Sequence, residues 1–253
     1  MRTAVSVLVA LAVAAAPLGA QDTPRTYVLV HGAWGGGWAF RTVDSILTAA
    51  GHRVYRPTLT GLGERVHLAT PEVGLSTHVT DIANVLLFEN LRDVILVGHS
   101  YGGMVITGVA DRAPERIRHL VFIDALLPAH GESLVTASRG TKLEGFARRS
   151  VDSAQGGFIV PTWVNARSPR PTDVRQPVRT FTEPVSFKNP AALRLPATYV
   201  LTVEAGRAES EDDFAAFATR AKARGYTYHV LRANHVPERS APVPLTVLLR
   251  SVP

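Results

Sequence analysis

The stretch DVILVGHSYGGMVITGVA, residues 93–110, decides the fold of this chain. It begins with the apolar run VILV, ends with apolar residues at helical spacing, and holds the pentapeptide GHSYG between the two. Such a pattern is typical of a buried strand, a tight turn and a helix. GHSYG also matches G-x-S-x-G, in which a sharp strand-to-helix turn carries a serine. The sequence therefore predicts that Ser100 is exposed at the carboxyl end of a strand, and that Gly98 and Gly102 leave room for the turn.

Strands and helices continue to alternate on both sides of this stretch. Short β-branched runs predict strands at residues 26–32, 53–59, 93–99, 117–125, 197–204 and 227–233. Amphipathic segments predict helices at residues 40–51, 75–90, 102–114 and 211–225. Several strands are almost continuously apolar, as strands buried on both faces are. The predicted fold class is α/β, with a mostly parallel sheet of about six strands and helices on both faces.

One long segment, residues 126–196, departs from this alternation. It is rich in proline, arginine and glycine. A structureless loop of that length is uncommon in a compact domain, so the segment is predicted to be an inserted cap or lid. Its aromatic side chains either line an apolar pocket or form a small core of the cap, and the sequence leaves both open. They are Phe146, Phe158, Trp163, Phe181 and Phe187.

The first twenty residues have the features of a targeting segment. MRTAVSVLVALAVAAAPLGA, residues 1–20, places an apolar run after Arg2 and ends in small residues, as a secretory signal peptide does. We expect cleavage near Ala20 and an exported domain of residues 21–253, periplasmic or secreted. No other segment approaches about 18 consecutive apolar residues, so no stable membrane insertion is expected after cleavage.

Composition limits the remaining classes of function. The chain has 253 residues, 46% of them hydrophobic, which is enough for one large domain with a buried core. The formal net charge is +6, but the basic residues are scattered, so no nucleic-acid partner is expected. The absence of cysteine excludes disulfides, thiolate metal sites and a cysteine nucleophile. No metal-binding motif is present, and the oligomeric state is not indicated by the sequence.

A serine hydroxyl becomes a useful nucleophile only when a base removes its proton. His235, in RANHVPERSAP, follows the last predicted strand in a loop and can reach the carboxyl edge of the sheet. His99 lies beside Ser100, but alternation along the strand turns its side chain away. The other seven histidines fall earlier in the chain or within elements. His235 is therefore the candidate base.

The candidate acid must hold the second ring nitrogen of that histidine. Asp124, in HLVFIDALLP, ends an apolar strand, and a carboxylate among such neighbours is costly to bury without a partner. Glu204, in TYVLTVEAG, ends the next strand and is the alternative acid. We favour Asp124, because Glu204 precedes Ala205 and Gly206 and could simply face water.

Two backbone amides are candidates for an oxyanion hole. The N–H of Tyr101 follows the candidate nucleophile at a helix N-terminus. The glycine-rich turn HGAWGGGW, residues 31–38, follows the first strand and offers the N–H of Ala33. This turn lacks both G-x-G-x-x-G and the lysine of a P-loop, so it does not indicate phosphate binding.

The segments YVLVHGAWGGGW, TLTGLGER, VGHSYGGMVITGVA and VFIDALLPAHGES together resemble the α/β-hydrolase superfamily. More narrowly, they resemble bacterial esterase relatives of plant methyl salicylate esterases and hydroxynitrile lyases. The resemblance implies a triad of Ser100, an acid and His235, an oxyanion hole at Ala33 and Tyr101, and no cofactor. Many members carry the acid where Glu204 and Ala205 stand. The expected aspartate is missing there, and Asp124 occupies a position that haloalkane dehalogenases and some lipases use.

The expected function is that of a serine carboxylic-ester hydrolase, which forms an acyl-enzyme from small to medium apolar or aromatic esters. The lyases that the chain resembles carry threonine and lysine where Gly32 and Val236 stand, which favours hydrolysis over cyanide release. Lyase-like, lactonase or amidase activity on the same site remains an alternative. A further alternative is a binding protein that captures a ligand on a hydrolase scaffold without turning it over.

Overall fold

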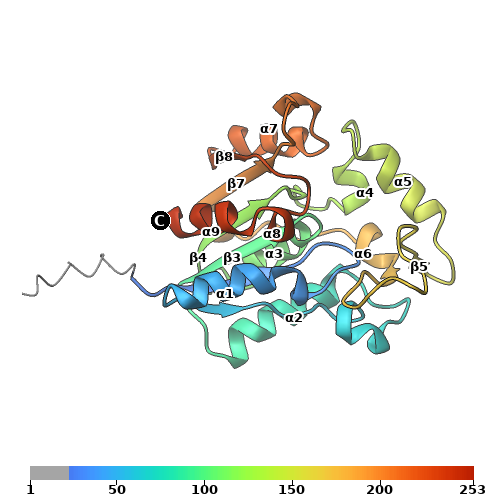
Figure 1. Ribbon diagram of the computed structural model, residues 1–253, viewed down its shortest axis with the longest axis horizontal. Helices are drawn as coiled ribbons and strands as arrows, with labels where there is room; N and C mark the ends of the chain where they lie inside the picture. Colours follow the sequence, from blue (N-terminus) through green and yellow to red (C-terminus); the bar gives the residue numbers. More distant parts are fainter. Residues whose placement is uncertain (1–22) are drawn as a thin grey trace, which may run out of the picture.

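The computed structural model describes residues 23–253, and the predicted signal peptide lies outside the described residues. Figure 1 follows the chain through a central sheet with helices on both of its faces. The six strands of that sheet are β1 (Thr26–Val30), β2 (Arg53–Tyr55), β3 (Val94–His99), β4 (Ile117–Ile123), β7 (Ala197–Thr202) and β8 (Thr227–Leu231). They lie in the order β2-β1-β3-β4-β7-β8, and every pair is parallel. The fold class predicted from the sequence is confirmed.

Helices cover both faces because residues of each strand alternate between two apolar layers. In β1, Tyr27 and Leu29 pack in the layer beneath α1 (Arg41–Ala49) and α9 (Pro242–Ser251). Val28 and Val30 pack in the opposite layer. That layer lies beneath α2 (Leu75–Phe88), α3 (Gly102–Arg112) and α7 (Ala215–Ala223). Strand β3, in the middle of the sheet, is buried along its whole length.

The predicted strand at residues 53–59 is too long at its carboxyl end. Strand β2 stops at Tyr55, two residues before Pro57, because proline has no N–H to donate to a neighbouring strand. The predicted helix at residues 211–225 likewise starts late, at Ala215. Its first residues form a turn instead, in which the Asp212 carboxylate accepts a hydrogen bond from the Phe214 amide at 2.9 Å.

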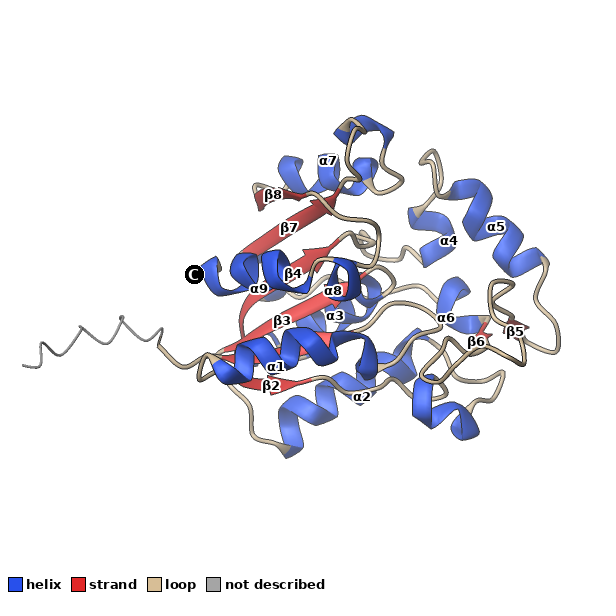
Figure 2. Ribbon diagram, viewed as in Figure 1, coloured by secondary structure: helices blue, strands red, loops and turns tan. Residues whose placement is uncertain are grey.

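The segment between β4 and β7, residues 126–196, is called the cap segment below. It contains α4 (Leu134–Ala137), α5 (Glu144–Asp152), β5 (Phe158–Ile159), β6 (Gln176–Pro177), α6 (Arg179–Thr182) and the 3₁₀ turn η4 (Ala192–Arg194). β5 and β6 form a separate antiparallel pair. In Figure 2 the strands of the main sheet point toward α4, α5 and α6, so the cap segment lies beyond their carboxyl ends.

The remaining elements are short. They are η1 (Gly37–Phe40), η2 (Gly63–Leu68), η3 (Pro114–Arg116), η5 (Glu209–Glu211) and α8 (Pro237–Ser240). No helix among residues 23–253 is long and apolar enough to cross a membrane.

Candidate active site

Ser100 stands at the turn between β3 and α3, where the sequence predicts it. Its φ is +54°, which is uncommon for a residue with a side chain. The turn is possible only because its neighbours are small. A Cβ on Gly98 would lie 2.7 Å from the Gly102 carbonyl oxygen, and a Cβ on Gly102 would lie 2.6 Å from the Val30 carbonyl oxygen. Both glycines are therefore required by the close approach of the backbone.

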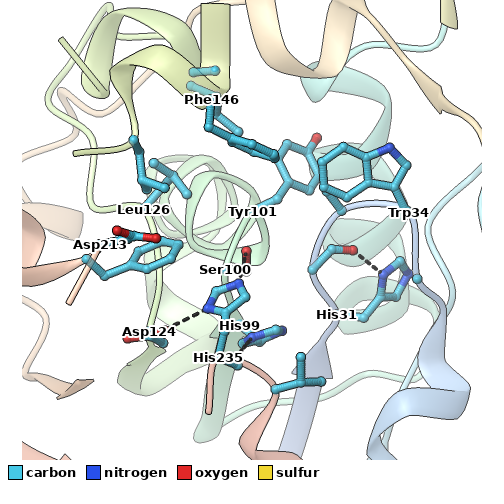
Figure 3. A pocket seen from close by; sticks show the side chains of 18 of the residues that line it. His31, Trp34, His99, Ser100, Tyr101, Asp124, Leu126, Phe146, Asp213 and His235 are labelled. Atoms are coloured by element: carbon cyan, nitrogen blue, oxygen red, sulfur yellow. Dashed lines mark hydrogen bonds and ion pairs between the residues drawn. The ribbon is translucent and has the colours of Figure 1, made fainter. Parts of the chain in front are cut away.

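Ser100, His235 and Asp124 form a continuous hydrogen-bonded line (Figure 3). The Ser100 Oγ lies 3.1 Å from His235 Nε2, and His235 Nδ1 lies 2.7 Å from Asp124 Oδ2. A carboxylate can only accept, so Nδ1 carries the proton and Nε2 is free to accept the serine proton. The structure thus brings together the three residues that the sequence analysis selected.

Asp124 is buried, with 1% of its surface exposed, and it follows the last residue of β4. Its two carboxylate oxygens have separate partners, because Oδ1 accepts from the Thr202 amide at 3.1 Å while Oδ2 faces His235. A buried carboxylate held in this way stays oriented toward the imidazole. The side chain of the alternative acid, Glu204, is exposed at the rim of the cavity.

The surroundings of His235 make it more basic than an ordinary histidine. Burial alone would lower its pKa, but the hydrogen bond to Asp124 and the charges of Asp124, Glu238 and Asp212 outweigh burial and raise the pKa above the usual 6.5. The ring also stacks on Phe214, with centroids 4.8 Å apart and planes 11° apart. These contacts hold the ring in one plane with Nε2 toward Ser100.

The Ala33 amide lies in the turn after β1, and His31 fixes the peptide to which it belongs. The Leu59 N–H donates to His31 Nε2 at 3.1 Å, so Nδ1 carries the proton and donates to the Gly32 carbonyl at 2.8 Å. Burial lowers the pKa of His31 to about 4, which keeps this neutral tautomer. In a trans peptide the N–H points opposite to the C=O. The Ala33 N–H is therefore directed away from His31.

Tyr101 immediately precedes α3, so its N–H lies where a helix leaves its first amides without internal acceptors. Its side chain is anchored away from the serine. His78 Nε2 donates to the Thr60 carbonyl at 2.9 Å, which leaves Nδ1 to accept from the Tyr101 hydroxyl at 2.9 Å. Burial lowers the pKa of His78 to about 4 and so preserves this arrangement.

The sequence analysis missed a buried pair behind the candidate base. His99 Nε2 donates to the main-chain carbonyl of His235 at 2.6 Å, and His99 Nδ1 lies 3.3 Å from Glu238 Oε1. Burial raises the pKa of Glu238 to about 7 and lowers the pKa of His99 well below its ordinary value. The pair lies directly behind the His235 loop, and His99 holds the main-chain carbonyl of His235 in place. Nothing in PERS, residues 237–240, distinguishes this glutamate from one on a solvated helix.

A cavity of about 800 Å³ opens above Ser100, within the size range of small-molecule sites. Figure 3 places Trp34, Phe146 and Leu126 around it. Trp34 makes edge-to-face contacts with Phe146, Trp163 and Phe181 at centroid distances of 6.0, 5.1 and 5.5 Å.

The cap aromatics left open by the sequence divide into two groups. Phe146, Trp163 and Phe181 line the cavity. Phe158 and Phe187 are buried elsewhere, each under an arginine guanidinium. Charged side chains at the rim are of both signs. Among residues 23–253, no cluster of three or more histidines and carboxylates is arranged to hold a metal ion.

Comparisons with known proteins find relatives that are named as esterases. The carbendazim hydrolyzing esterase of Nocardioides sp. (strain SG-4G) is 58% identical over 109 residues, which are 43% of this chain and 45% of that protein. Methylesterase 1 of Arabidopsis thaliana is 31% identical over 121 residues, 46% of each chain. The chain thus spans less than half the length of these curated relatives.

A solved structure extends the comparison over most of the chain. The extracellular alpha/beta-hydrolase from a Paenibacillus species superposes with a TM-score of 0.74 at 22% identity, over 89% of this chain and 98% of that one. This likeness concerns the fold. A family model described as "Alpha/beta hydrolase family" matches residues 27–246. Because that match covers nearly all of the described chain and confirms the resemblance seen in its motifs, this protein belongs to the alpha/beta hydrolase family.

Proposed function

We propose that the protein is a serine hydrolase of carboxylic esters that works through an acyl-enzyme. The observation that carries the proposal is the line from Ser100 through His235 to Asp124, with distances of 3.1 and 2.7 Å. It joins a nucleophile, a base and an acid that holds the base in the required tautomer. The names of the relatives, an esterase and a methylesterase, support the same reaction class.

In the first stage, Ser100 Oγ forms a bond to the ester carbonyl carbon while His235 Nε2 takes the hydroxyl proton. The carbonyl oxygen becomes an oxyanion, for which the N–H groups of Ala33 and Tyr101 are the proposed donors. When the tetrahedral intermediate collapses, the bond to the leaving oxygen breaks, and His235 gives its proton to the departing alcohol. Asp124 stabilises the imidazolium throughout.

In the second stage, water repeats the attack on the acyl-enzyme. His235 removes a proton from the water, and the resulting oxygen bonds to the acyl carbon. Collapse of the second intermediate breaks the bond to Ser100 Oγ, which recovers its proton from His235. The products are one carboxylic acid and one alcohol, and the protein returns to its starting state.

The cavity supports small to medium esters with an apolar or aromatic group. Its volume of about 800 Å³ exceeds what a methyl ester of a short acid fills. The aromatic wall formed by Trp34, Phe146, Trp163 and Phe181 offers edges and faces to a planar group. We therefore expect esters that carry a phenyl or larger ring to have higher kcat/KM than short aliphatic esters.

The test combines a substrate panel with covalent labelling. Purified protein is assayed on aliphatic esters, aryl esters, lactones, anilides and cyanohydrins, and a fluorophosphonate adduct is located by mass spectrometry. We expect aryl-ester turnover and a single adduct on Ser100. Preferred turnover of lactones, anilides or cyanohydrins would replace ester hydrolysis with that reaction. Labelling of Ser100 without turnover of any substrate would favour the ligand-binding alternative.

The aromatic wall makes its own prediction. Phe146 lines the cavity and is 40% exposed. Removing its ring in Phe146→Ala is expected to weaken the binding of an aryl substrate by about 1.5 kcal/mol. KM for phenyl esters should rise about tenfold while kcat changes little. Phe88→Ala, at the exposed end of α2, is the matched control and should leave both constants unchanged. An equal rise in KM for methyl esters would contradict aryl recognition by this ring.

A further inference from the structure

The turn that follows β1 has a backbone conformation that its own residues do not favour. Trp34 has φ of +61°, and the Gly35 N–H donates to the Ala33 carbonyl at 2.8 Å, so residues 33–35 form a three-residue turn. Positive φ at a bulky side chain is an outlier. Such a conformation persists only where the surrounding structure holds it, and it is found most often at functional sites.

The cap segment supplies the hydrogen bonds that hold Trp34. The Trp34 N–H donates to Gln176 Oε1 at 2.9 Å, and its carbonyl accepts from the Val174 N–H at 2.9 Å. The indole Nε1 donates to the Ile159 carbonyl at 3.2 Å. All three partners come from a segment more than 120 residues further along the chain. The cap segment thus holds the turn by hydrogen bonds to both the main chain and the side chain of Trp34.

Gln176 is oriented by a second contact within the cap segment. The residue is fully buried, and its Nε2 donates to Thr180 Oγ1 at 2.7 Å. The Thr180 hydroxyl gives its own proton to the Pro177 carbonyl at 2.6 Å, so it can only accept from Gln176. Both Oε1 and Nε2 of the Gln176 amide are therefore hydrogen-bonded, which keeps Oε1 directed toward the Trp34 N–H.

These contacts bear on the Ala33 amide because Ala33 lies between two clamped peptide planes. His31 holds the carbonyl of the peptide before it, as described above. The peptide after it is held at both ends, since the Gly35 N–H binds its carbonyl and Gln176 binds its N–H. The direction of the Ala33 N–H thus depends on His31 on one side and on the cap segment on the other.

We propose that Gln176 is a positioning residue that holds the turn at residues 33–35 so that the Ala33 N–H faces the developing oxyanion. The inference rests on the proposed function, because it needs an ester carbonyl at Ser100. On this inference the cap segment raises the rate of the reaction by positioning the Ala33 N–H, in addition to lining the cavity.

The test is Gln176→Met, which keeps the length of the side chain and removes both hydrogen bonds. We expect kcat per active site to fall about 10- to 100-fold while KM for a phenyl ester stays within about twofold. Active sites are counted by the final stoichiometry of fluorophosphonate labelling. Affinity for a trifluoromethyl ketone, which forms an oxyanion on Ser100, should fall by the same factor as kcat.

Ser133→Ala is the matched control for general loosening of the cap segment. Ser133 is buried and caps α4 by accepting from the Thr136 N–H at 3.2 Å, but it does not touch Trp34. This variant should lower Tm and leave kcat per labelled site unchanged. Should Gln176→Met fail to fold, Thr180→Val decides the question, because it frees the amide from its anchor. Its kcat is expected to fall about three- to tenfold.

Wild-type kcat per labelled site in Gln176→Met, or a rise in KM alone, would overturn the inference and leave the proposed function standing. Wild-type kcat per labelled site in Thr180→Val, or a rise in KM alone in that variant, would likewise overturn the inference. Wild-type protein that neither hydrolyses esters nor labels at Ser100 would overturn the proposed function and this inference together.

Discussion

Ester hydrolysis by Ser100→Ala is expected to fall about 10⁵- to 10⁶-fold in kcat, because the variant has no oxygen to form the acyl-enzyme. The fold should not change, because alanine adopts the left-handed backbone conformation of this turn at about the same cost as serine, and Gly98 and Gly102 remain in place. Wild-type and variant protein are compared by steady-state hydrolysis of a p-nitrophenyl ester and by thermal unfolding. A product inhibitor should still bind with wild-type affinity.

Ser76→Ala serves as the control, because Ser76 is an exposed serine on α2, outside the cavity. It should hydrolyse the ester at the wild-type rate and should not affect fluorophosphonate labelling. Turnover by Ser100→Ala within tenfold of the wild-type rate would remove Ser100 from the mechanism and place the nucleophile elsewhere.

Asp124→Asn is expected to lower kcat about 10⁴-fold. The amide can offer an N–H to His235 Nδ1, which favours the tautomer with the proton on Nε2 and leaves that nitrogen unable to accept from Ser100. The pH profile should also move. His235 must be neutral to act as a base, so activity is lost as pH falls through the pKa of His235. Burial lowers this pKa, but the hydrogen bond to Asp124 and the charge of Asp124 outweigh burial and raise it. Without that carboxylate the acidic limb of kcat/KM should shift to lower pH.

Glu204→Gln provides the comparison, because Glu204 is the alternative acid and is exposed at the cavity rim. Its kcat should stay within about threefold of wild type, and the acidic limb should stay in place. Measuring kcat/KM from pH 4.5 to 9 in both variants separates the two carboxylates. A larger loss in Glu204→Gln than in Asp124→Asn would reverse the assignment.

The fold could be predicted from the sequence because its strongest signals are local. Continuous apolar runs such as VILV in β3 are typical of strands buried on both faces, and glycine or proline ends several of the predicted elements. The errors lie at boundaries. Pro57 shortens β2, and the turn at Asp212 delays α7, which are effects of single residues that periodicity alone does not register.

Three positions of the candidate site could also be selected from the sequence, since each has a distinctive setting. Ser100 stands in a motif, Asp124 is a carboxylate among apolar neighbours, and His235 follows the last strand. All three lie at the same edge of the sheet because parallel strands bring their carboxyl ends together. Secondary structure and chain order are enough to place them near one another.

The supporting residues could not be predicted, because their contacts join segments that no local pattern connects. Gln176 meets Trp34 across 142 residues, and His99 meets the His235 carbonyl across 136. Both depend on where the cap segment and the last loop fold back, which side-chain packing determines. Glu238 carries no mark of burial in its sequence, so only its three-dimensional surroundings reveal its partner.

Non-glycine residues with positive φ are concentrated at one place in the molecule. Five are found among residues 23–253, and three of them, Trp34, Ser100 and Asp124, belong to the candidate site or its supporting turn. Glycine would adopt the same backbone conformations at lower cost, so keeping these three side chains stores conformational strain at the candidate site. At these three positions the backbone conformation that the candidate site requires therefore lowers the stability of the fold. Engineering a hardier variant has to begin elsewhere, in the exposed helices and distant loops.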